Sequence, residues 1–414
     1  MKVLINAYAV RPNSGSEGGA AWQWITRLSQ KHELYIITEG EWRKEIEEEV
    51  TNLPNKGRIH FYYNTVSDEV RRMCWNQGDY RFYFYYARWQ KKTLAIAKEI
   101  MKNEKIDLIH QLNMIGFREP GYLWKIKRIP FVWGPIGGMN MVPMQYMNDA
   151  PIGIRIKYRL KNFVSRVQYK YSPRVLKAIK RADALLAANK ASYEVLTKLY
   201  PNKYVTLVNE TGSNSNDVEV RKNRDKKTFD ILWVGRFIPT KLLGLSLEVF
   251  SKLRELPGLK VHIVGQAFDE VDTERYHLMA KEKGLESICQ WHGWVSHDEV
   301  QQLMQKSDIF FFPSVVEGTP HVVLEAIANC LPIVCFDTCG QAEAVDDTVG
   351  RKIQLSTPRE SISLFTDAII TLYSDRDLLT SLSNGCINRK RQLSWDRKFA
   401  QLEEIYDKFS KTYV

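Results

Sequence analysis

The chain has 414 residues, of which 44% are hydrophobic and 26% are charged. This balance excludes a disordered chain, and no apolar run reaches the roughly 18 residues of a membrane-spanning helix. The net charge of +11 leaves three kinds of partner open: nucleic acid, an anionic membrane surface and an anionic substrate. At roughly 100–200 residues per domain, this length predicts two or three domains.

The amino-terminal half alternates short apolar runs with helical stretches. Strands are expected at 2–9, 32–38, 106–114 and 129–138, and a passage from helix to strand at 181–189. Such alternation predicts a parallel sheet covered by helices on both faces. The first run, MKVLINAYAV, has no cleavable signal pattern, so we expect a cytoplasmic chain.

Two features of this half are candidates for ligand binding. The stretch GSEGGAAW follows the first expected strand, where Gly18 and Gly19 would let the backbone approach a phosphate or sugar closely. His110 ends the run IDLIH, where it would face a cleft and donate to a sugar hydroxyl or stabilise developing charge. A plain turn and a buried core histidine are the alternatives.

A basic segment follows at residues 151–182. It contains ten Lys or Arg and no Asp or Glu. Within it Ile156, Leu160, Phe163 and Val167 recur at helical spacing, with Lys and Arg around them. This pattern suits a helix on an anionic bilayer surface, and it equally suits a solvated helix packed on a core.

The polar stretch 209–228 predicts a linker between two domains. Beyond it, apolar runs at 229–235, 259–265, 308–313 and 332–337 have the length and flanking turn residues of buried parallel strands. We therefore expect two Rossmann-like doubly wound domains, facing each other across a cleft at the carboxyl ends of their strands. Their predicted bounds are 1–208 and 229–392, with a final helix at 393–414 packing back on the first domain.

The stretch EGTPHVVLEAIANC, from Glu317 to Cys330, follows an expected strand. Thr319 suits an N-cap and Pro320 the first helical position, so a helix is predicted up to about Asn329. Its first amides, those of His321 and Val322, would form an anion site.

Glu317 and Glu325 would flank that anion site. Carboxylates repel phosphate, so they would instead accept hydroxyl donors on either side of it. A ligand with hydroxyls, phosphate and further hydroxyls is a nucleotide sugar. The alternative is that Glu317 is a loop charge and Glu325 a solvated helix residue.

The stretch VGRFIPTKLLG also follows an expected strand of the second domain. Arg236 and Lys241 lie in its turn, where they could neutralise a diphosphate. Loop cations are often only solvated, so this signal depends on its position at the carboxyl end of a strand in the same sheet.

Together these motifs resemble the retaining nucleotide-sugar glycosyltransferases of the GT-B fold, over nearly the whole chain. The E-x(7)-E spacing of Glu317 and Glu325 matches that family's signature. The resemblance implies that Glu317 contacts the donor sugar, that Glu325 contacts the ribose, and that Arg236 and Lys241 hold the diphosphate. It further implies that the donor is contacted by the glycine-rich loop, by residues near the nucleotide base and by the loop of Glu317. These residues are Gly18, Gly19, Trp294, Val295, Gly318, Thr319, His321 and Val322.

The sequence departs from the family pattern at three places. Leu242 follows the lysine where Gly is common, the loop reads EGTPH where EG-aromatic-G is frequent, so that Pro320 removes one amide donor, and Leu112 replaces the second His of an H-x-H pair. The catalytic candidates are Glu317, Lys241, Arg236 and His110.

The resemblance also implies front-face transfer with retention, to a saccharide or lipid-linked acceptor. We expect no cofactor, since the nucleotide sugar is a co-substrate, and no metal, because no D-x-D pair stands in the right context. The six cysteines show no metal-type spacing and are expected to be reduced thiols. The alternatives are an NDP-sugar epimerase of the same fold and a non-catalytic basic protein that binds a membrane surface or nucleic acid; no nucleic-acid module is visible.

Overall fold

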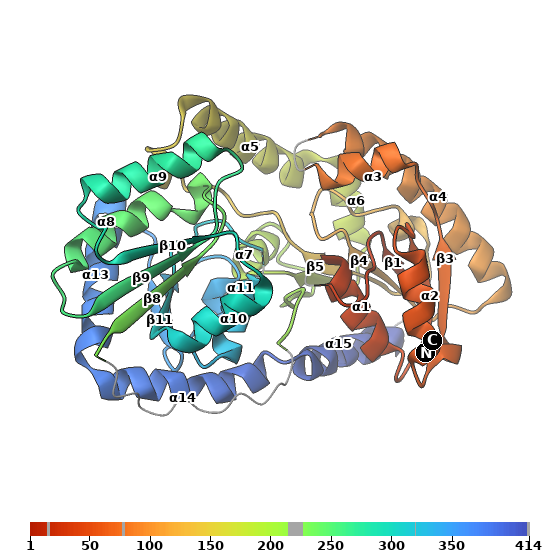
Figure 1. The fold of residues 1–414 in the computed structure, drawn as a ribbon. Coiled ribbons are helices and arrows are strands. Elements are labelled where there is room, and N and C mark those ends of the chain that lie inside the picture. The colour runs from red at the N-terminus through yellow and green to blue at the C-terminus, as the bar shows by residue number, and fades with distance from the viewer. Residues whose placement is uncertain (15–16, 77–78, 214–226, 319, 412–414) are drawn as a thin grey trace. The chain divides into compact units, whose positions relative to one another are not determined.

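The computed structural model describes residues 1–14, 17–76, 79–213, 227–318 and 320–411 (Figure 1). Contacts within the chain divide it into two compact units. The first comprises Met1–Met139, Val164–Thr211 and Trp395–Val414. The second comprises Asn140–Phe163 and Gly212–Ser394.

The first unit contains a seven-stranded parallel sheet with the order β3-β2-β1-β4-β5-β6-β7. The strands are β1 (Lys2–Ala7), β2 (Glu33–Thr38), β3 (Ile59–Tyr63), β4 (Leu108–Asn113), β5 (Phe131–Ile136), β6 (Ala184–Ala187) and β7 (Val205–Leu207). The order reverses between β1 and β4, which is the switch point of a doubly wound sheet.

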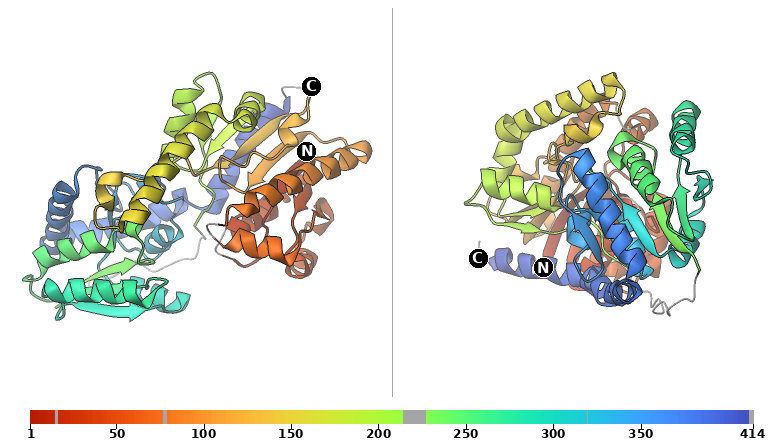
Figure 2. Two further views of the ribbon diagram at one scale, coloured as in Figure 1. Left: turned by 90° about the horizontal axis from the view of Figure 1, so that it is seen from above. Right: turned by 90° about the vertical axis from the view of Figure 1, so that its left-hand side faces the viewer.

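Helices cover this sheet. They are α1 (Glu17–Leu28), α2 (Arg43–Asn52), α3 (Asp68–Trp75), α4 (Arg81–Asn103), α6 (Pro173–Arg181), α7 (Lys190–Leu199) and α15 (Trp395–Ser410). Helix α15, dark blue in Figures 1 and 2, lies against α1, where the Trp24 and Trp395 rings meet edge to face with centroids 5.4 Å apart. It buries Leu402, Ile405 and Tyr406 in the core of the first unit because its apolar residues recur at helical spacing.

The second unit contains a six-stranded parallel sheet with the order β10-β9-β8-β11-β12-β13. The strands are β8 (Phe229–Val234), β9 (Leu259–Val264), β10 (Cys289–Gly293), β11 (Ile309–Phe312), β12 (Ile333–Phe336) and β13 (Gly350–Ile353). This order again reverses in the middle, here between β8 and β11. The prediction of two doubly wound α/β domains is therefore confirmed, and the cleft between them stays a prediction.

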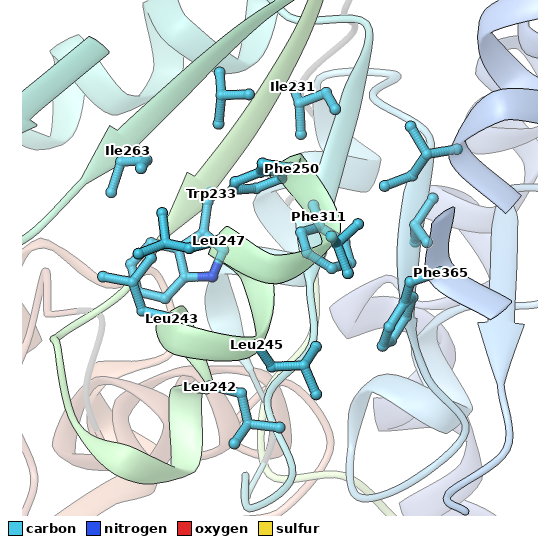
Figure 3. Close-up of a cluster of buried hydrophobic side chains, with 14 of the residues drawn as sticks. Ile231, Trp233, Leu242, Leu243, Leu245, Leu247, Phe250, Ile263, Phe311 and Phe365 are labelled. Atoms are coloured by element: carbon cyan, nitrogen blue, oxygen red, sulfur yellow. The ribbon is translucent and has the colours of Figure 1, made fainter. Parts of the chain in front are cut away.

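The helices of the second unit are α8 (Leu243–Leu253), α9 (Glu270–Glu282), α10 (His297–Lys306), α11 (His321–Ala328), α12 (Gln341–Ala344), α13 (Pro358–Ser374) and α14 (Arg376–Gln392). Side chains from β8, α8, β11 and α13 point toward one another in its core (Figure 3). Among them, the Phe311 ring packs edge to face against Phe250 and Phe365. These buried aromatic contacts fix α8 and α13 on one face of the sheet.

The predicted division of the chain differs from the observed one at residues 140–163. The sequence-based boundary placed them in the first domain, whereas their contacts group them with the second unit. The reason is burial: Val142, Tyr146 and Met147 lie in the same apolar core as β8 and α8. Residues 214–226 of the predicted linker lie outside the described residues.

The basic segment forms two helices, α5 (Ile152–Tyr171) and α6, with a break before Pro173. Pro173 stands at the start of α6, where its missing N–H costs no hydrogen bond. Helix α5 carries the apolar and basic pattern noted in the sequence.

Candidate functional site

Two loops meet at the switch point of the second sheet. One follows β8 and runs through a short 3-10 helix (Pro239–Lys241), and the other follows β11 and leads into α11. The Val315 N–H donates to the Thr240 carbonyl at 3.0 Å, and the Ser314 hydroxyl donates to the same oxygen at 3.2 Å. These bonds join the loops at the edge of the sheet where open α/β domains bind ligands.

The joined loops bring Lys241 and Glu317 together. The Lys241 Nζ lies 2.5 Å from Glu317 Oε1, and the Ser314 hydroxyl donates to the same oxygen, also at 2.5 Å. The two side chains are only 17% and 15% exposed. An ammonium group has three N–H donors, so Lys241 can hold Glu317 and still contact an anion.

The sequence prediction for α11 needs correction at its start. The helix begins at His321 and ends at Ala328, with Pro320 in the N-cap position and not in the first helical turn. The Pro320 carbonyl accepts from the Val323 N–H at 3.0 Å, so the His321 and Val322 amides precede the first helical hydrogen bond. Thr319, the predicted N-cap, lies outside the described residues.

Glu325 faces helix α10. Its carboxylate lies 3.4 Å from His297 Nε2 and accepts from Gln301 Nε2 at 3.2 Å. One turn earlier in α11, burial lowers the pKa of His321, and the charge of Glu325 acts against that shift. The Glu325 carboxylate is thus 32% exposed and lies beside the His297 ring and the Gln301 amide.

The remaining candidates of the second unit range from half-buried to exposed. The Arg236 guanidinium lies 5.2 Å from the centroid of the Phe268 ring, which is 86% exposed. Trp294 is 71% exposed and follows the edge strand β10, while Val295 packs on the core. Gly318 is exposed beside Glu317.

In the first unit, the predicted position of His110 is wrong. The ring is fully buried, and both nitrogens have partners: the Tyr406 hydroxyl at 2.6 Å and the Gly134 carbonyl at 2.7 Å. Burial lowers its pKa to about 4, so the ring is neutral at physiological pH. The alternative interpretation, a core histidine with satisfied hydrogen bonds, describes it correctly.

Gly18 and Gly19 lie in the first turn of α1 and not in an open loop. A Cβ on Gly19 would stand 1.7 Å from the Ser14 carbonyl oxygen, so glycine is needed there for close backbone packing. Their neighbour Glu17 accepts from the Ile115 N–H at 2.7 Å, and burial raises its pKa to about 7. This contact joins the elements that follow β1 and β4.

Three residues of the site were missed from the sequence: Asn140, Ser314 and Cys339. Ser314 lies three residues before Glu317 and could have been noted from its place at the end of an apolar run. Asn140 and Cys339 were not predicted as site residues, because they reach Glu317 from segments distant along the chain.

The loops with Arg236, Lys241 and Glu317 all fall within residues 215–392, which match the family model of glycosyl transferases group 1. This match covers less than half of the chain. Among curated relatives, the capsular polysaccharide biosynthesis glycosyltransferase CapH of Staphylococcus aureus is 28% identical over 54% of this chain. A D-inositol 3-phosphate glycosyltransferase of Corynebacterium aurimucosum is 25% identical over 42% of the chain.

These alignments span 65% and 42% of the two relatives, less than two thirds of either. Solved structures match more of the chain. The lipopolysaccharide outer core galactosyltransferase WaaB aligns at a TM-score of 0.66, with 16% identity over 99% of this chain and 100% of that one. Anabaena HepE in complex with UDP aligns at 0.62, with 15% identity and the same coverage. This likeness identifies the fold as GT-B.

The described part of the chain contains no helix long and apolar enough to cross a bilayer. Nor does that part contain a group of three or more His, Cys, Asp or Glu side chains gathered as for a metal ion.

Proposed function

We propose that the chain is a retaining glycosyltransferase that moves a sugar from a UDP- or GDP-sugar to an acceptor hydroxyl. The observation that carries this proposal is the Lys241–Glu317 pair, which lies at the switch point of a domain of glycosyl transferases group 1. The names of CapH and WaaB support an acceptor from bacterial surface polysaccharide or glycolipid synthesis. The acceptor in this proposal is a saccharide or a lipid-linked saccharide.

Each site residue has a proposed role. Arg236 and Lys241 bind the diphosphate, and the His321 and Val322 amides add a partial positive charge. Glu317 accepts a hydroxyl of the donor sugar and Glu325 a ribose hydroxyl, with the base near Trp294 and Val295. In this proposal no metal takes part, since Arg236 and Lys241 supply the positive charge.

In the reaction, the bond between the anomeric carbon and the diphosphate oxygen breaks, and the acceptor oxygen bonds to the same face. The acceptor proton passes to the departing diphosphate, so the chain supplies no nucleophile. The leaving group gains negative charge in the transition state, which Arg236 and Lys241 stabilise electrostatically.

Binding and transfer can be tested in turn. UDP- and GDP-sugars are first screened for thermal stabilisation, since a bound ligand raises apparent stability by mass action. Lys241→Ala and Glu317→Ala are then assayed with the selected donor, and each should lower kcat/KM by about 10²-fold. Lys260→Ala, at an exposed position of β9, is the control. Near-parental turnover in both site variants would reject the assignment.

The same assay separates the transferase from an epimerase. Without acceptor, an epimerase would convert the donor sugar to its epimer, whereas the transferase would leave it unchanged or hydrolyse it slowly. Analysis of the recovered sugar by anion-exchange chromatography decides between them.

We further propose that the enzyme works in the cytoplasm at the inner face of the cell membrane, bound through α5. The apolar side chains of α5 at helical spacing are exposed: Ile152 73%, Ile156 59%, Leu160 60%, Phe163 65% and Tyr171 70%. Basic residues stand between them, and this combination suits an anionic bilayer surface.

Vesicle flotation tests the membrane contact. The chain should float with phosphatidylglycerol vesicles and less with phosphatidylcholine vesicles, and Lys157→Gln with Arg159→Gln and Lys161→Gln should release it. Unchanged flotation would reject this role for α5. Flotation without turnover of any nucleotide sugar would favour the non-catalytic binding protein.

A further inference from the structure

We propose that Asn140 and Cys339 are positioning residues, which hold the main chain of Glu317 so that its carboxylate meets the donor sugar. This inference rests on the proposed function, because it assigns the sugar contact to Glu317. Neither residue was among the candidate site residues of the sequence.

Asn140 makes the first contact. Its Nδ2 donates to the Glu317 carbonyl at 2.9 Å and to Cys339 Sγ at 3.2 Å. Both partners are acceptors in this arrangement, so the amide must present its NH₂ group to them and not its oxygen. Two acceptors therefore fix the orientation of the Asn140 side chain.

Cys339 makes the second contact. It is 2% exposed, and its φ of +56° puts its main chain in the left-handed region, in the turn after β12. Its thiol donates to the Val315 carbonyl at 3.5 Å. Burial raises the pKa of this thiol, and a hydrogen bond from the main chain of Glu317 acts against that rise. Cys339 thus contacts the Glu317 loop at two residues.

Glu317 is consequently held at both ends. Ser314 and Lys241 hold its carboxylate, while Asn140 and Cys339 hold its peptide groups. A carboxylate in a loop loses rotational freedom only if its main chain is also held, and that order is what orienting a sugar hydroxyl requires.

The segment that carries Asn140 is itself anchored in the second unit. Asn162 Oδ1 accepts from the Val142 N–H at 3.0 Å, and the Tyr146 hydroxyl lies 2.8 Å from Ser361 Oγ. These contacts fix Asn140 independently of Glu317, so it can act as a rigid support.

A positioning role for Asn140 predicts that its loss lowers transfer from the nucleotide sugar but not the binding of the diphosphate. Asn140→Ala frees the loop main chain but leaves Arg236 and Lys241 in place. Affinity for a nucleoside diphosphate alone should therefore stay within about twofold of the parent, while kcat/KM for the nucleotide sugar falls about tenfold, the effect of one lost hydrogen bond to a buried partner. A variant that merely destabilised the domain would weaken both.

The experiment uses the full chain with UDP, UDP-glucose, GDP and GDP-mannose as probes. Dissociation constants for the diphosphates come from calorimetry, and kcat and KM from the transfer assay. Gln145→Ala is the matched control, since Gln145 lies in the same segment and donates to the Ser356 carbonyl, away from Glu317. Asn140→Asp adds a pH readout: its carboxylate would repel the Glu317 carbonyl, and protonation would restore a donor, so its activity relative to the parent should rise as pH falls.

Hydrogen exchange supplies a measurement that needs no substrate. Peptides covering 314–318 should exchange faster in Asn140→Ala than in the parent, and not in Gln145→Ala. Unchanged exchange would overturn the inference, as would a parallel loss of diphosphate and nucleotide-sugar affinity. If the parent neither binds nor transfers any of the probes, the proposed function is rejected. If exchange in Asn140→Ala is nevertheless faster over 314–318, the conclusion that Asn140 holds this loop remains.

Discussion

At the scale of single residues, Lys241 and His110 show opposite outcomes of the same kind of reasoning. Both were selected for their residue type at the end of an apolar run. Lys241 lies in the loop after β8, contacts Glu317 and is partly exposed. His110 lies inside β4, a central strand whose six residues are all buried. Residue type alone therefore does not decide access to solvent; the place of the residue in the sheet does.

His110 leads to a prediction about pH. Its folded-state pKa of about 4 lies below the ordinary value of 6.5, so the unfolded chain binds a proton first as pH falls. The stability that neutral His110 contributes is present above pH 6.5 and is lost toward about 4. This contribution to the free energy of unfolding is on the order of 3 kcal/mol.

The measurement compares the parent with His110→Gln, which does not titrate. The difference in the free energy of unfolding between them should shrink as pH falls through this window, followed by chemical denaturation at several pH values. A constant difference would contradict the buried, neutral histidine.

At the scale of elements, the strands missed from the sequence share one property. Strands β3, β7, β10 and β13 are the four edge strands of the two sheets. Edge strands have a neighbour on one side only, so they bury less and need no continuous apolar run, as the half-buried residues of β3 and β7 show. The central strands were all recognisable because both their faces are covered by helices.

Gly19 leads to a prediction about helix α1. Gly19→Ala would force a Cβ against the Ser14 carbonyl, only 1.7 Å away, so the backbone must shift. We expect a loss of more than about 3 kcal/mol in the stability of the first unit. Thermal unfolding measures it.

Gly153→Ala is the matched control, because a Cβ there meets nothing within 4 Å and the residue lies in helix α5. It should stabilise the helix by about 0.5–1 kcal/mol. Equal effects of the two substitutions would contradict the close packing assigned to Gly19.

At the scale of the whole molecule, the chain passes between its two units more often than a simple two-domain order requires. Residues 140–163 belong to the second unit, and the chain then returns to the first. The final helix also belongs to the first unit. Each unit is therefore completed by a segment from outside its own half of the sequence.

Tyr146 leads to a prediction about this arrangement. Its ring packs edge to face on Phe336, and its hydroxyl contacts Ser361 Oγ at 2.8 Å and the Ser356 N–H at 3.0 Å. Tyr146→Ala should cost the second unit about 3–5 kcal/mol, and Tyr146→Phe about 1 kcal/mol.

Hydrogen exchange across β12 and α13 measures the effect, since only the second unit should lose protection. Tyr171→Ala, at a residue 70% exposed, is the control and should change little. Loss of protection in the first unit instead would contradict the grouping of residues 140–163 with the second.

The sequence by itself determined the two doubly wound domains, and it predicted Arg236, Lys241, Glu317 and Glu325 as candidate site residues. Those features depend on short-range signals: apolar runs, turn residues, and charged groups that directly follow a strand. Only the tertiary structure decided that His110 is buried, that Gly19 packs against Ser14, and that Asn140 and Cys339 hold Glu317. These depend on which segments pack together, and packing brings together residues whose separation along the chain carries no periodic pattern.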